Sequence, residues 1–238
     1  DGYLLEMGGS ACIFACQCAK LGLRTAGLGR VGEDAFGELV LSRLAQAGVD
    51  TANVTPDAGL QTGLGLALCR KEGDRAILTV PGSIDSADPE ALLALLPKAR
   101  HLHVASYYLL AGMRRHWPEI LREARRLGLT VSLDTNWDPA ERWDGLEELA
   151  PYLDILFPND SELAAFTGIG DVDRAMAALA EKVPLVAAKL GAAGAAVLRR
   201  GRTVVRCPAM DVAVADTVGA GDTFDGGFLY GWLNGLPP

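Results

Sequence analysis

The sequence predicts a single three-layer α/β domain, with helices on both faces of a mostly parallel central sheet. Two observations carry this prediction. Helical and strand patterns alternate over most of the 238 residues, which is typical of crossover connections between parallel strands. A chain of this length buries roughly three quarters of its unfolded surface, which is enough for one core, and no low-complexity linker divides it. We therefore treat residues 1–238 as one domain.

Hydrophobic periodicity places the expected elements in order. Helices are expected at residues 10–21, at 34–47 before Gly48, and at 113–127, where arginines and glutamates form a solvated face. Strands of the sheet are expected at residues 25–29, 100–105, 130–134, 153–157 and 184–190. Residues 195–206 predict a hairpin through Arg200-Gly201-Arg202, ahead of a last, glycine-rich helix.

Residues 53–82 interrupt the alternation of helices and strands. Thr62 to Arg70 and Arg75 to Val80 predict two strands around the turn Glu72-Gly73-Asp74, which is a hairpin rather than a crossover. We expect this segment to form a small β lid or an edge hairpin within the domain.

Composition excludes several classes of partner. The net charge of −8 argues against a nucleic-acid or anionic-membrane surface, since both need clustered Lys and Arg. No apolar run approaches the roughly 18 to 20 residues of a membrane span and no signal pattern opens the chain, so we expect a cytoplasmic protein. The five cysteines lack the paired spacings of a zinc site, and His101 and His103 share a strand face without an evident third ligand.

The most informative run is Asp-Thr-Val-Gly-Ala-Gly-Asp-Thr-Phe-Asp-Gly-Gly-Phe at residues 216–228. A helix N-terminus leaves four N–H groups without intrahelical partners and favours anions, and Gly219, Ala220 and Gly221 leave the approach to them open. Asp222 falls in the same turn, where its carboxylate can accept the proton of a hydroxyl that attacks a bound phosphate. The run therefore predicts phosphoryl-transfer chemistry.

The same run resembles the C-terminal signature of the ribokinase-like (PfkB) carbohydrate kinases. The resemblance implies a ribokinase-like fold and transfer of the γ-phosphate of ATP, with Mg²⁺, to a hydroxyl of a sugar-like substrate or a nucleoside. It makes Asp222 the base and the amides of residues 219–222 the anion hole. The break in the alternation at the hairpin suggests in addition that the hairpin is a lid that excludes water. The resemblance also makes Asp216 and the carbonyl of Val218 candidate ligands of a monovalent cation such as K⁺. Family members extend beyond both ends of this sequence, so we expect the chain to be truncated at both ends.

A second motif is Asn159-Asp160-Ser161-Glu162, where an expected strand runs into a helix. Asn followed three residues later by Glu is also a helix capping box, and from these four residues alone capping is the simpler interpretation. The motif resembles the family's Asn-x-x-Glu, which lies near the phosphates. The resemblance assigns Asn159 to the nucleotide and Glu162 to Mg²⁺ through water, a task that suits hard oxygen ligands.

The acceptor side is expected at the paired glycines Gly8-Gly9 before the first helix. These resemble the family's N-terminal motif, in which the backbone approaches the sugar. The family usually has Asn four residues after the second glycine, and this chain has Ile13, which leaves the substrate class open. Tyr107 follows the strand at 100–105, in a region that lines the sugar pocket in relatives, although it also fits a half-buried aromatic residue.

The nucleotide side is expected at the ends of two strands, because ligands of open α/β sheets bind at the carboxyl ends of the strands. Asn136, in Asp134-Thr135-Asn136, is expected to reach the transferred phosphate. Lys189 is expected to do the same, or to lie on the surface. Gly191 and Gly194 resemble the family's nucleotide segment, where glycines allow close approach to ATP.

Two other classes of function stay open at this stage. A non-catalytic relative would bind a sugar or nucleotide without chemistry, an interpretation for which Ile13 is the one hint. Residues 27–32 match G-x-G-x-x-G, with Asp50 at a tolerable distance, which would indicate a nicotinamide-dependent oxidoreductase if a strand preceded the glycines. A homodimer is compatible with either class.

Overall fold

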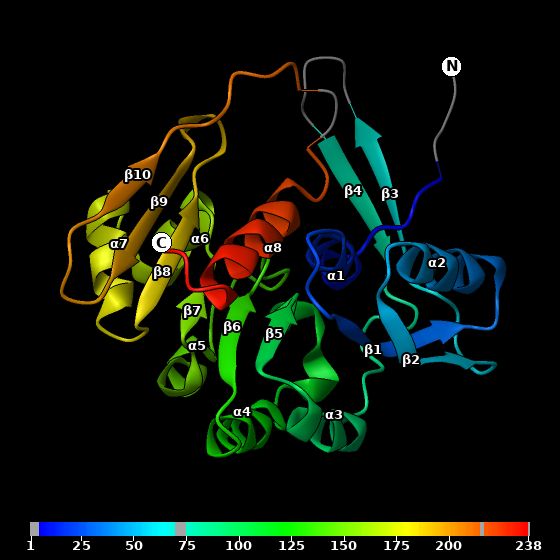
Figure 1. The fold of residues 1–238 in the computed structure, drawn as a ribbon. Helices are drawn as coiled ribbons and strands as arrows, with labels where there is room; N and C mark the ends of the chain where they lie inside the picture. Colours follow the sequence, from blue (N-terminus) through cyan, green and yellow to red (C-terminus); the bar gives the residue numbers. More distant parts are fainter. Residues whose placement is uncertain (1–4, 70–74, 215–216, 238) are drawn as a thin grey trace.

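The computed structural model of the chain describes residues 5–69, 75–214 and 217–237. Its centre is a six-stranded sheet in the order β10-β9-β8-β7-β6-β5 (Figure 1). The four parallel strands are β5 (His101–Ala105), β6 (Thr130–Asp134), β7 (Ile155–Leu156) and β8 (Leu185–Lys189). The antiparallel strands β9 (Ala195–Arg199) and β10 (Val205–Cys207) close one edge, which confirms the expected hairpin at 195–206. The fold is therefore the predicted α/β class with a mostly parallel sheet.

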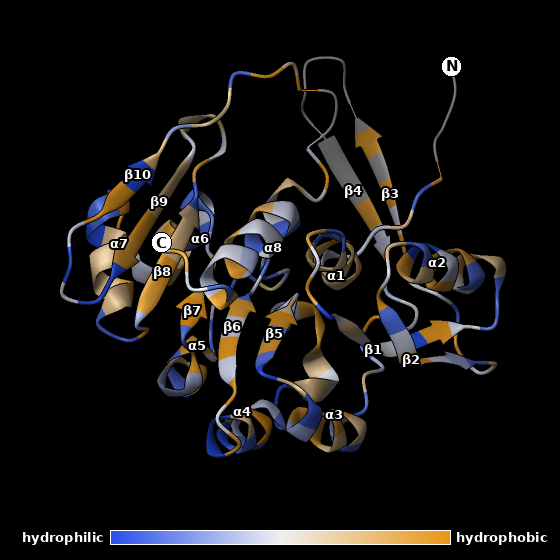
Figure 2. Ribbon diagram, viewed as in Figure 1, coloured by the Kyte–Doolittle hydropathy of each residue, from blue (hydrophilic) through white to orange (hydrophobic). Residues whose placement is uncertain are grey.

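Helices cover both faces of this sheet. Ile155 and Phe157 pack with Leu229 beneath α1 (Ser10–Lys20) and α8 (Ala220–Leu233), whereas Leu156 faces the opposite cluster. This alternation follows from the two-residue period of a strand that is buried on both sides. The helices that contribute to the opposite cluster are α3 (Pro89–Leu95), α4 (Trp117–Arg126), α5 (Leu146–Leu149), α6 (Asp160–Thr167) and α7 (Val172–Ala180). Figure 2 shows the apolar strands between the two helical layers.

A smaller parallel pair differs from the sequence prediction. β1 (Ala26–Gly32) is longer than the expected strand at 25–29. It pairs with β2 (Asp50–Asp57), and α2 (Ala35–Gln46) connects the two strands along the chain. Residues 53–57, which were expected in the lid segment, therefore belong to β2 instead. Its sequence, Asp-Thr-Ala-Asn-Val-Thr-Pro-Asp, has one large aliphatic residue and a proline, so periodicity gave no strand signal.

The expected hairpin is confirmed as β3 (Leu64–Cys69) paired antiparallel with β4 (Arg75–Val80), while its turn at 72–74 lies outside the described residues. At its base Thr62 Oγ1 donates to Asp34 and accepts from the Gly32 N–H at 2.9 Å. A Cβ built at Gly32 would lie 2.7 Å from the Leu60 carbonyl oxygen, so the chain crossing here requires glycine. The hairpin projects from this base beyond α1 and α2 (Figure 1).

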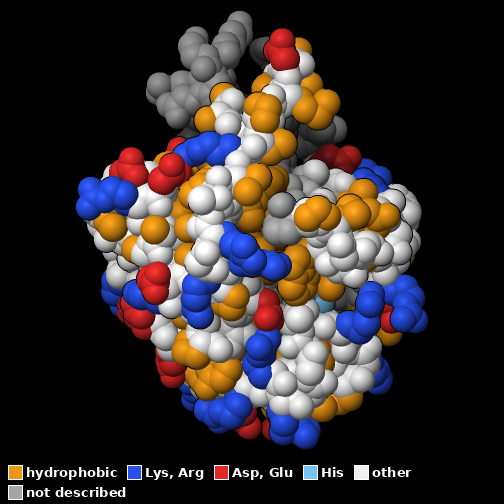
Figure 3. Space-filling model, turned by 60° about the vertical axis from the view of Figure 1, so that its left-hand side comes forward, with side chains coloured by type: hydrophobic (Ala, Val, Ile, Leu, Met, Phe, Trp, Pro, Cys, Tyr) orange, Lys and Arg blue, Asp and Glu red, His pale blue; other side chains and the backbone are white. Residues whose placement is uncertain are grey.

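The helix expected at 113–127 begins only at Trp117. Pro118 occupies the first turn, a position that suits proline because the first N–H groups of a helix have no intrahelical partner. Residues 107–113 form two 3₁₀ turns instead. Over the face shown in Figure 3, Lys and Arg side chains are interspersed with Asp and Glu.

Candidate active site

The glycine-rich run forms a helix start, as the sequence predicts. Gly219 is the residue before α8, with φ of 73°, and contributes no side chain to cap the helix. A Cβ built there would lie 2.8 Å from Ile13 Cγ2, so a glycine is needed for both conformation and space. Asp222 follows in the first turn and is 8% exposed. The first amides of α8 and a buried carboxylate therefore lie in one turn.

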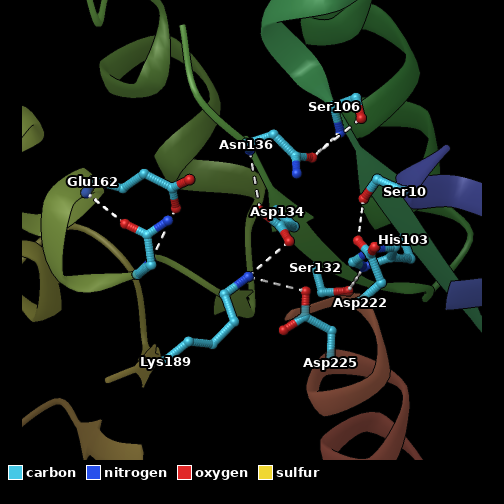
Figure 4. Close-up of polar contacts among 11 residues, drawn as sticks. Ser10, His103, Ser106, Ser132, Asp134, Asn136, Glu162, Lys189, Asp222 and Asp225 are labelled. Carbon is cyan, nitrogen blue, oxygen red and sulfur yellow. Dashed lines mark hydrogen bonds and ion pairs between the residues drawn. The ribbon is translucent and has the colours of Figure 1, made fainter. Parts of the chain in front are cut away.

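Two helices meet at Asp222. The hydroxyl of Ser10, the first residue of α1, donates to Asp222 Oδ1 (Figure 4). Burial raises the pKa of Asp222 above its ordinary value, and the charge of Asp134 adds to this effect, while the Ser10 hydrogen bond and Lys189 oppose it. Sequence reasoning did not identify Ser10, because no motif connects positions 212 residues apart.

A buried charge cluster lies beside this turn. Lys189 Nζ is 2.7 Å from Asp134 Oδ2 and 3.3 Å from Asp225 Oδ2 (Figure 4). The ammonium holds the pKa of Asp134 below its usual range although burial opposes this, while burial raises the pKa of Asp225 well above its usual range. A Cβ on Gly221 would lie 3.5 Å from Lys189 Nζ, which places the cation beside the start of α8.

Lys189 is thus not a surface residue, and Asp225 was missed by sequence reasoning. A signal for Asp225 did exist, since it lies three residues after Asp222 and therefore on the same face of the helix. The residues that it meets, however, come from β6 and β8, which no local pattern connects to α8.

Asn159 and Glu162 form the capping box at the start of α6. Glu162 N–H donates to Asn159 Oδ1 at 2.8 Å and Asn159 N–H donates to Glu162 Oε2 at 2.9 Å. Glu162 is 3% exposed, and burial, with a smaller contribution from Asp134, raises its pKa to about 7. The capping interpretation is confirmed. It does not exclude a role in ligand binding, since each carboxylate and amide group has a second polar atom.

Asn136 lies at the carboxyl end of β6 with φ of 54°. Its Oδ1 accepts from the N–H of Ser106 at 3.0 Å and from the Ser106 hydroxyl at 3.1 Å, and Ser106 is itself left-handed with φ of 57°. Non-glycine residues in this conformation cluster at functional sites. The carboxyl ends of β5 and β6 are therefore tied together, next to Asp134 (Figure 4).

The acceptor-side prediction separates into two parts. Gly8 and Gly9 precede α1, and a Cβ built at either would meet nothing within 4 Å, so space lies in front of both. Tyr107, in contrast, is 3% exposed and packs against Tyr108 and Arg114. Tyr107 thus lies in the core, which agrees with the alternative of a packing aromatic residue, and its role in substrate binding stays a prediction.

The remaining predicted residues fall as follows. Gly191 and Gly194 bound a 3₁₀ turn after β8, with φ of 54° and 87°. A Cβ on Gly194 would lie 2.0 Å from the Cys207 carbonyl oxygen, which accounts for this glycine by chain packing, whereas the space around Gly191 is open. Asp216, predicted to bind a monovalent cation, lies outside the described residues, and Val218 precedes Gly219, the cap residue of α8.

His101 and His103 do share a strand face, beneath α1 and α8. Both rings lie 2.8 Å from Ser132 Oγ, and the Phe14 ring stacks on His103 with centroids 3.7 Å apart. Burial lowers the pKa of each histidine to about 3. Within the described ranges no group of three His, Cys, Asp or Glu residues is arranged to hold a metal ion.

The dinucleotide hypothesis is wrong. Residues 27–32 lie inside strand β1, where the glycines of a dinucleotide motif would instead form the turn between a strand and a helix. Among the residues that the structure describes, no helix is long and apolar enough to cross a membrane.

The open helix start, the buried acid within it and the carboxylates at the end of β6 and the start of α6 define a phosphotransferase-type site on an α/β fold. The model of the pfkB family of carbohydrate kinases matches residues 3–238. The chain therefore belongs to this family, as its C-terminal signature predicted.

Individual relatives agree with this assignment. An uncharacterized sugar kinase from Archaeoglobus fulgidus is 31% identical over 91% of this chain and 86% of the relative. A ribokinase from Arabidopsis thaliana, solved in complex with ribose and ATP, has a TM-score of 0.82 at 26% identity and covers 97% of this chain and 76% of its own. A structure from E. coli in complex with ATP and Mg²⁺, with a TM-score of 0.86 at 23% identity over 99% and 80% of the two chains, shares the fold.

Proposed function

We propose that this kinase transfers the γ-phosphate of ATP to a hydroxyl of a sugar, a sugar derivative or a nucleoside, with Asp222 as the base. The observation that carries the proposal is the position of Asp222, buried within the first turn of α8 whose leading amides are not capped by a side chain. A phosphate bound to the amides of residues 219–222 would lie beside that carboxylate. The reacting groups are then held in one turn of helix.

The role of Asp222 follows from its acidity. A sugar hydroxyl is a far weaker acid than any carboxyl group, so Asp222 does not deprotonate it in the ground state. It accepts the proton as the new P–O bond forms, after the hydroxyl has begun to lose electron density to phosphorus. Phosphoryl transfer needs mainly positioning and charge stabilisation, which the helix amides and the nearby Lys189 supply.

Glu162 and Asn159 fit an Mg²⁺ role. Their oxygens are hard ligands, and both side chains lie together at the start of α6. Mg²⁺ held near them through water would neutralise charge on the ATP phosphates. Asn136, Gly191 and Gly194 then fall on the nucleotide side, at the ends of β6 and β8.

The acceptor would enter in front of Gly8 and Gly9. The absence of side chains there lets the acceptor approach the backbone, and the next residue, Ser10 at the start of α1, contacts Asp222. The hairpin β3–β4 is positioned by Thr62 and Asp34 to act as the lid over this side.

Three finer expectations accompany the proposal. A monovalent cation bound by Asp216 and the Val218 carbonyl would stiffen the loop before α8. A homodimer is supported by the exposed leucines 64, 66, 68 and 78 and Val80, which the β3–β4 register places on one face. Because ATP is the phosphate donor, we place the activity in the cytoplasm.

The decisive experiment is ADP release from ATP and Mg²⁺ with a panel of sugars, sugar acids, sugar phosphates and nucleosides. Asp222→Asn should lower turnover by about 10²-fold or more while ATP still raises the melting temperature. Asp173→Asn is the matched control, an exposed first-turn acid of α7. Acceptor binding without ADP release by the unmodified protein would instead favour the non-catalytic relative, and unchanged turnover of Asp222→Asn would remove Asp222 from the mechanism.

A further inference from the structure

Ser10 makes a long-range contact where a local one is the rule. Serine at a helix start is ordinarily the residue that caps the helix amides. Here Gly9 occupies the cap position, with φ of 85° and no side-chain hydrogen bond, and the Ser10 hydroxyl donates instead to Asp222 Oδ1 (Figure 4). The hydroxyl therefore serves the base rather than its own helix.

The two helices that carry these residues are held close together. A Cβ built at Gly226 of α8 would lie 3.2 Å from Gln17 Cβ and 3.6 Å from the backbone nitrogen of Cys18, both in α1. Because glycine permits this approach, the first turn of α1 stays in register with the first turn of α8. The position of Ser10 relative to Asp222 is thus set by packing farther along both helices.

The Ser10 hydrogen bond opposes the effects that would protonate Asp222. Among the described residues, the charged groups that act on Asp222 are Asp134 from β6 and Lys189 from β8, while α1 presents the neutral Ser10. A donor to the ionised carboxylate favours the form that can accept a proton. With Oδ1 engaged, the other oxygen, Oδ2, is the one that can face an incoming hydroxyl.

We propose that Ser10 is a positioning residue for the base: it fixes Asp222 through Oδ1 and directs Oδ2 toward the acceptor hydroxyl. This inference rests on the proposed function for its kinetic consequence. The interaction itself can be measured without any substrate.

The test compares Ser10→Ala with Ser10→Thr, which retains the hydroxyl, and with Ser42→Ala, which removes an exposed serine of α2. In Ser10→Ala we expect kcat to fall by about tenfold at neutral pH with the KM for ATP unchanged, and Ser10→Thr to recover most of the loss. Because the ionised form of Asp222 loses a donor, the acidic limb of the kcat profile should move to higher pH by about half a unit or more.

A second measurement separates this inference from the proposed function. The ¹³Cγ resonance of Asp222, assigned with Asp222→Asn, reports the pKa of that carboxyl in the unliganded protein. A rise of the pKa in Ser10→Ala supports the interaction even if no acceptor is phosphorylated, in which case the proposed function alone fails. An unmoved resonance titration, or a loss of turnover with an unmoved acidic limb, would reduce Ser10 to a structural contact and overturn the proposal.

A different observation bears on the acceptor. The point where a Cβ of Gly219 would sit is 3.7 Å from Asp222 Oδ2 and only 2.8 Å from Ile13 Cγ2. The Ile13 side chain and the oxygen proposed to receive the proton therefore border the same point beside Gly219. An acceptor hydroxyl placed against Ile13 would lose its water without gaining a partner.

We infer that Ile13 selects acceptors that carry no hydroxyl next to the reacting one on this side, that is, deoxy or alkyl-substituted sugars and nucleosides. This too rests on the proposed function. The test uses matched pairs, ribose with 2-deoxyribose, glucose with 2-deoxyglucose, and adenosine with its 2′- and 3′-deoxy forms. We expect at least one deoxy member to have the higher kcat/KM by about tenfold.

Ile13→Asn, which supplies an amide, should reverse that preference, whereas Ile13→Val, which keeps the hydrocarbon, should preserve it. A ratio that is the same in the unmodified protein and in Ile13→Asn would overturn the inference while leaving the kinase assignment intact. If no acceptor of the wider panel yields ADP, the proposed function fails and this inference falls with it.

Discussion

Replacing Gly219 with alanine should disturb the catalytic turn through two separable effects. The first is conformational, because φ is 73° at this position and a left-handed L-residue costs about 1–2 kcal/mol. The second is steric, because the new methyl group would lie 2.8 Å and 3.0 Å from two carbons of Ile13, and overpacking of this kind costs about 1–3 kcal/mol. If both distort the anion hole, turnover falls by roughly 10²–10³-fold, since about 1.4 kcal/mol corresponds to a factor of ten.

The double variant Gly219→Ala with Ile13→Ala separates these effects. Removing the Ile13 side chain relieves the overlap but leaves the conformational cost, so about tenfold of the lost turnover should return. Gly227→Ala is the control on the same helix, because a Cβ there meets nothing within 4 Å and alanine favours helix by up to about 1 kcal/mol. The assay is steady-state ADP release with melting temperatures measured in parallel. Turnover of Gly219→Ala within twofold of the unmodified enzyme, or no recovery in the double variant, would refute this account of the glycine.

Three further predictions concern stability. His101 and His103 are neutral in the folded protein, because burial lowers their pKa values to about 3. Below about pH 6.5 the unfolded chain therefore binds more protons than the folded one. The free energy of unfolding then falls as the pH decreases, by up to about 1.4 kcal/mol per pH unit for each ring. Melting temperatures between pH 7 and 5 check this, and a double His→Gln variant should flatten the curve. Lys189→Met should lower the free energy of unfolding by about 3–5 kcal/mol at pH 8 and by less at pH 5, where the carboxyl groups left behind can take up protons. Equal shifts of the urea midpoint at both pH values would contradict this account of the charge cluster. Thr62→Val should cost about 1–3 kcal/mol in urea unfolding through its lost hydrogen bonds to Gly32 and Asp34, and a cost near zero would mean that the hairpin base is held by other contacts.

Local sequence patterns predicted the start of α8 well. The run at 216–228 combines small residues with one acid immediately before an apolar helical pattern, and the structure begins α8 at Ala220 with Asp222 in its first turn. The capping box at Asn159 could also be anticipated, because its hydrogen bonds span only three residues. In both cases the information lies within one turn of helix.

The prediction was weaker where contacts are distant. β2 carries little hydrophobic signal of its own and forms because β1 lies beside it, and the G-x-G-x-x-G pattern suggested a nucleotide turn where the glycines instead belong to a strand. Tyr107 was expected either at the substrate or as a half-buried aromatic residue, and only packing decided how far its ring is buried beside Arg114. Periodicity cannot choose between such alternatives, since it describes an element and not its neighbours.

By itself, therefore, the sequence determined the class of fold, the family and the helix start that carries the proposed base, because each of these depends on residues close together in the chain. Only the tertiary structure decided what surrounds the base. Lys189 reaches Asp134 across 55 positions and Asp225 across 36, and Ser10 reaches Asp222 across 212. These groups meet because parallel strands bring their carboxyl ends to one edge of the sheet and because α1 packs on α8. The pKa of each carboxyl group then follows from its burial and from the charged and hydrogen-bonding groups beside it.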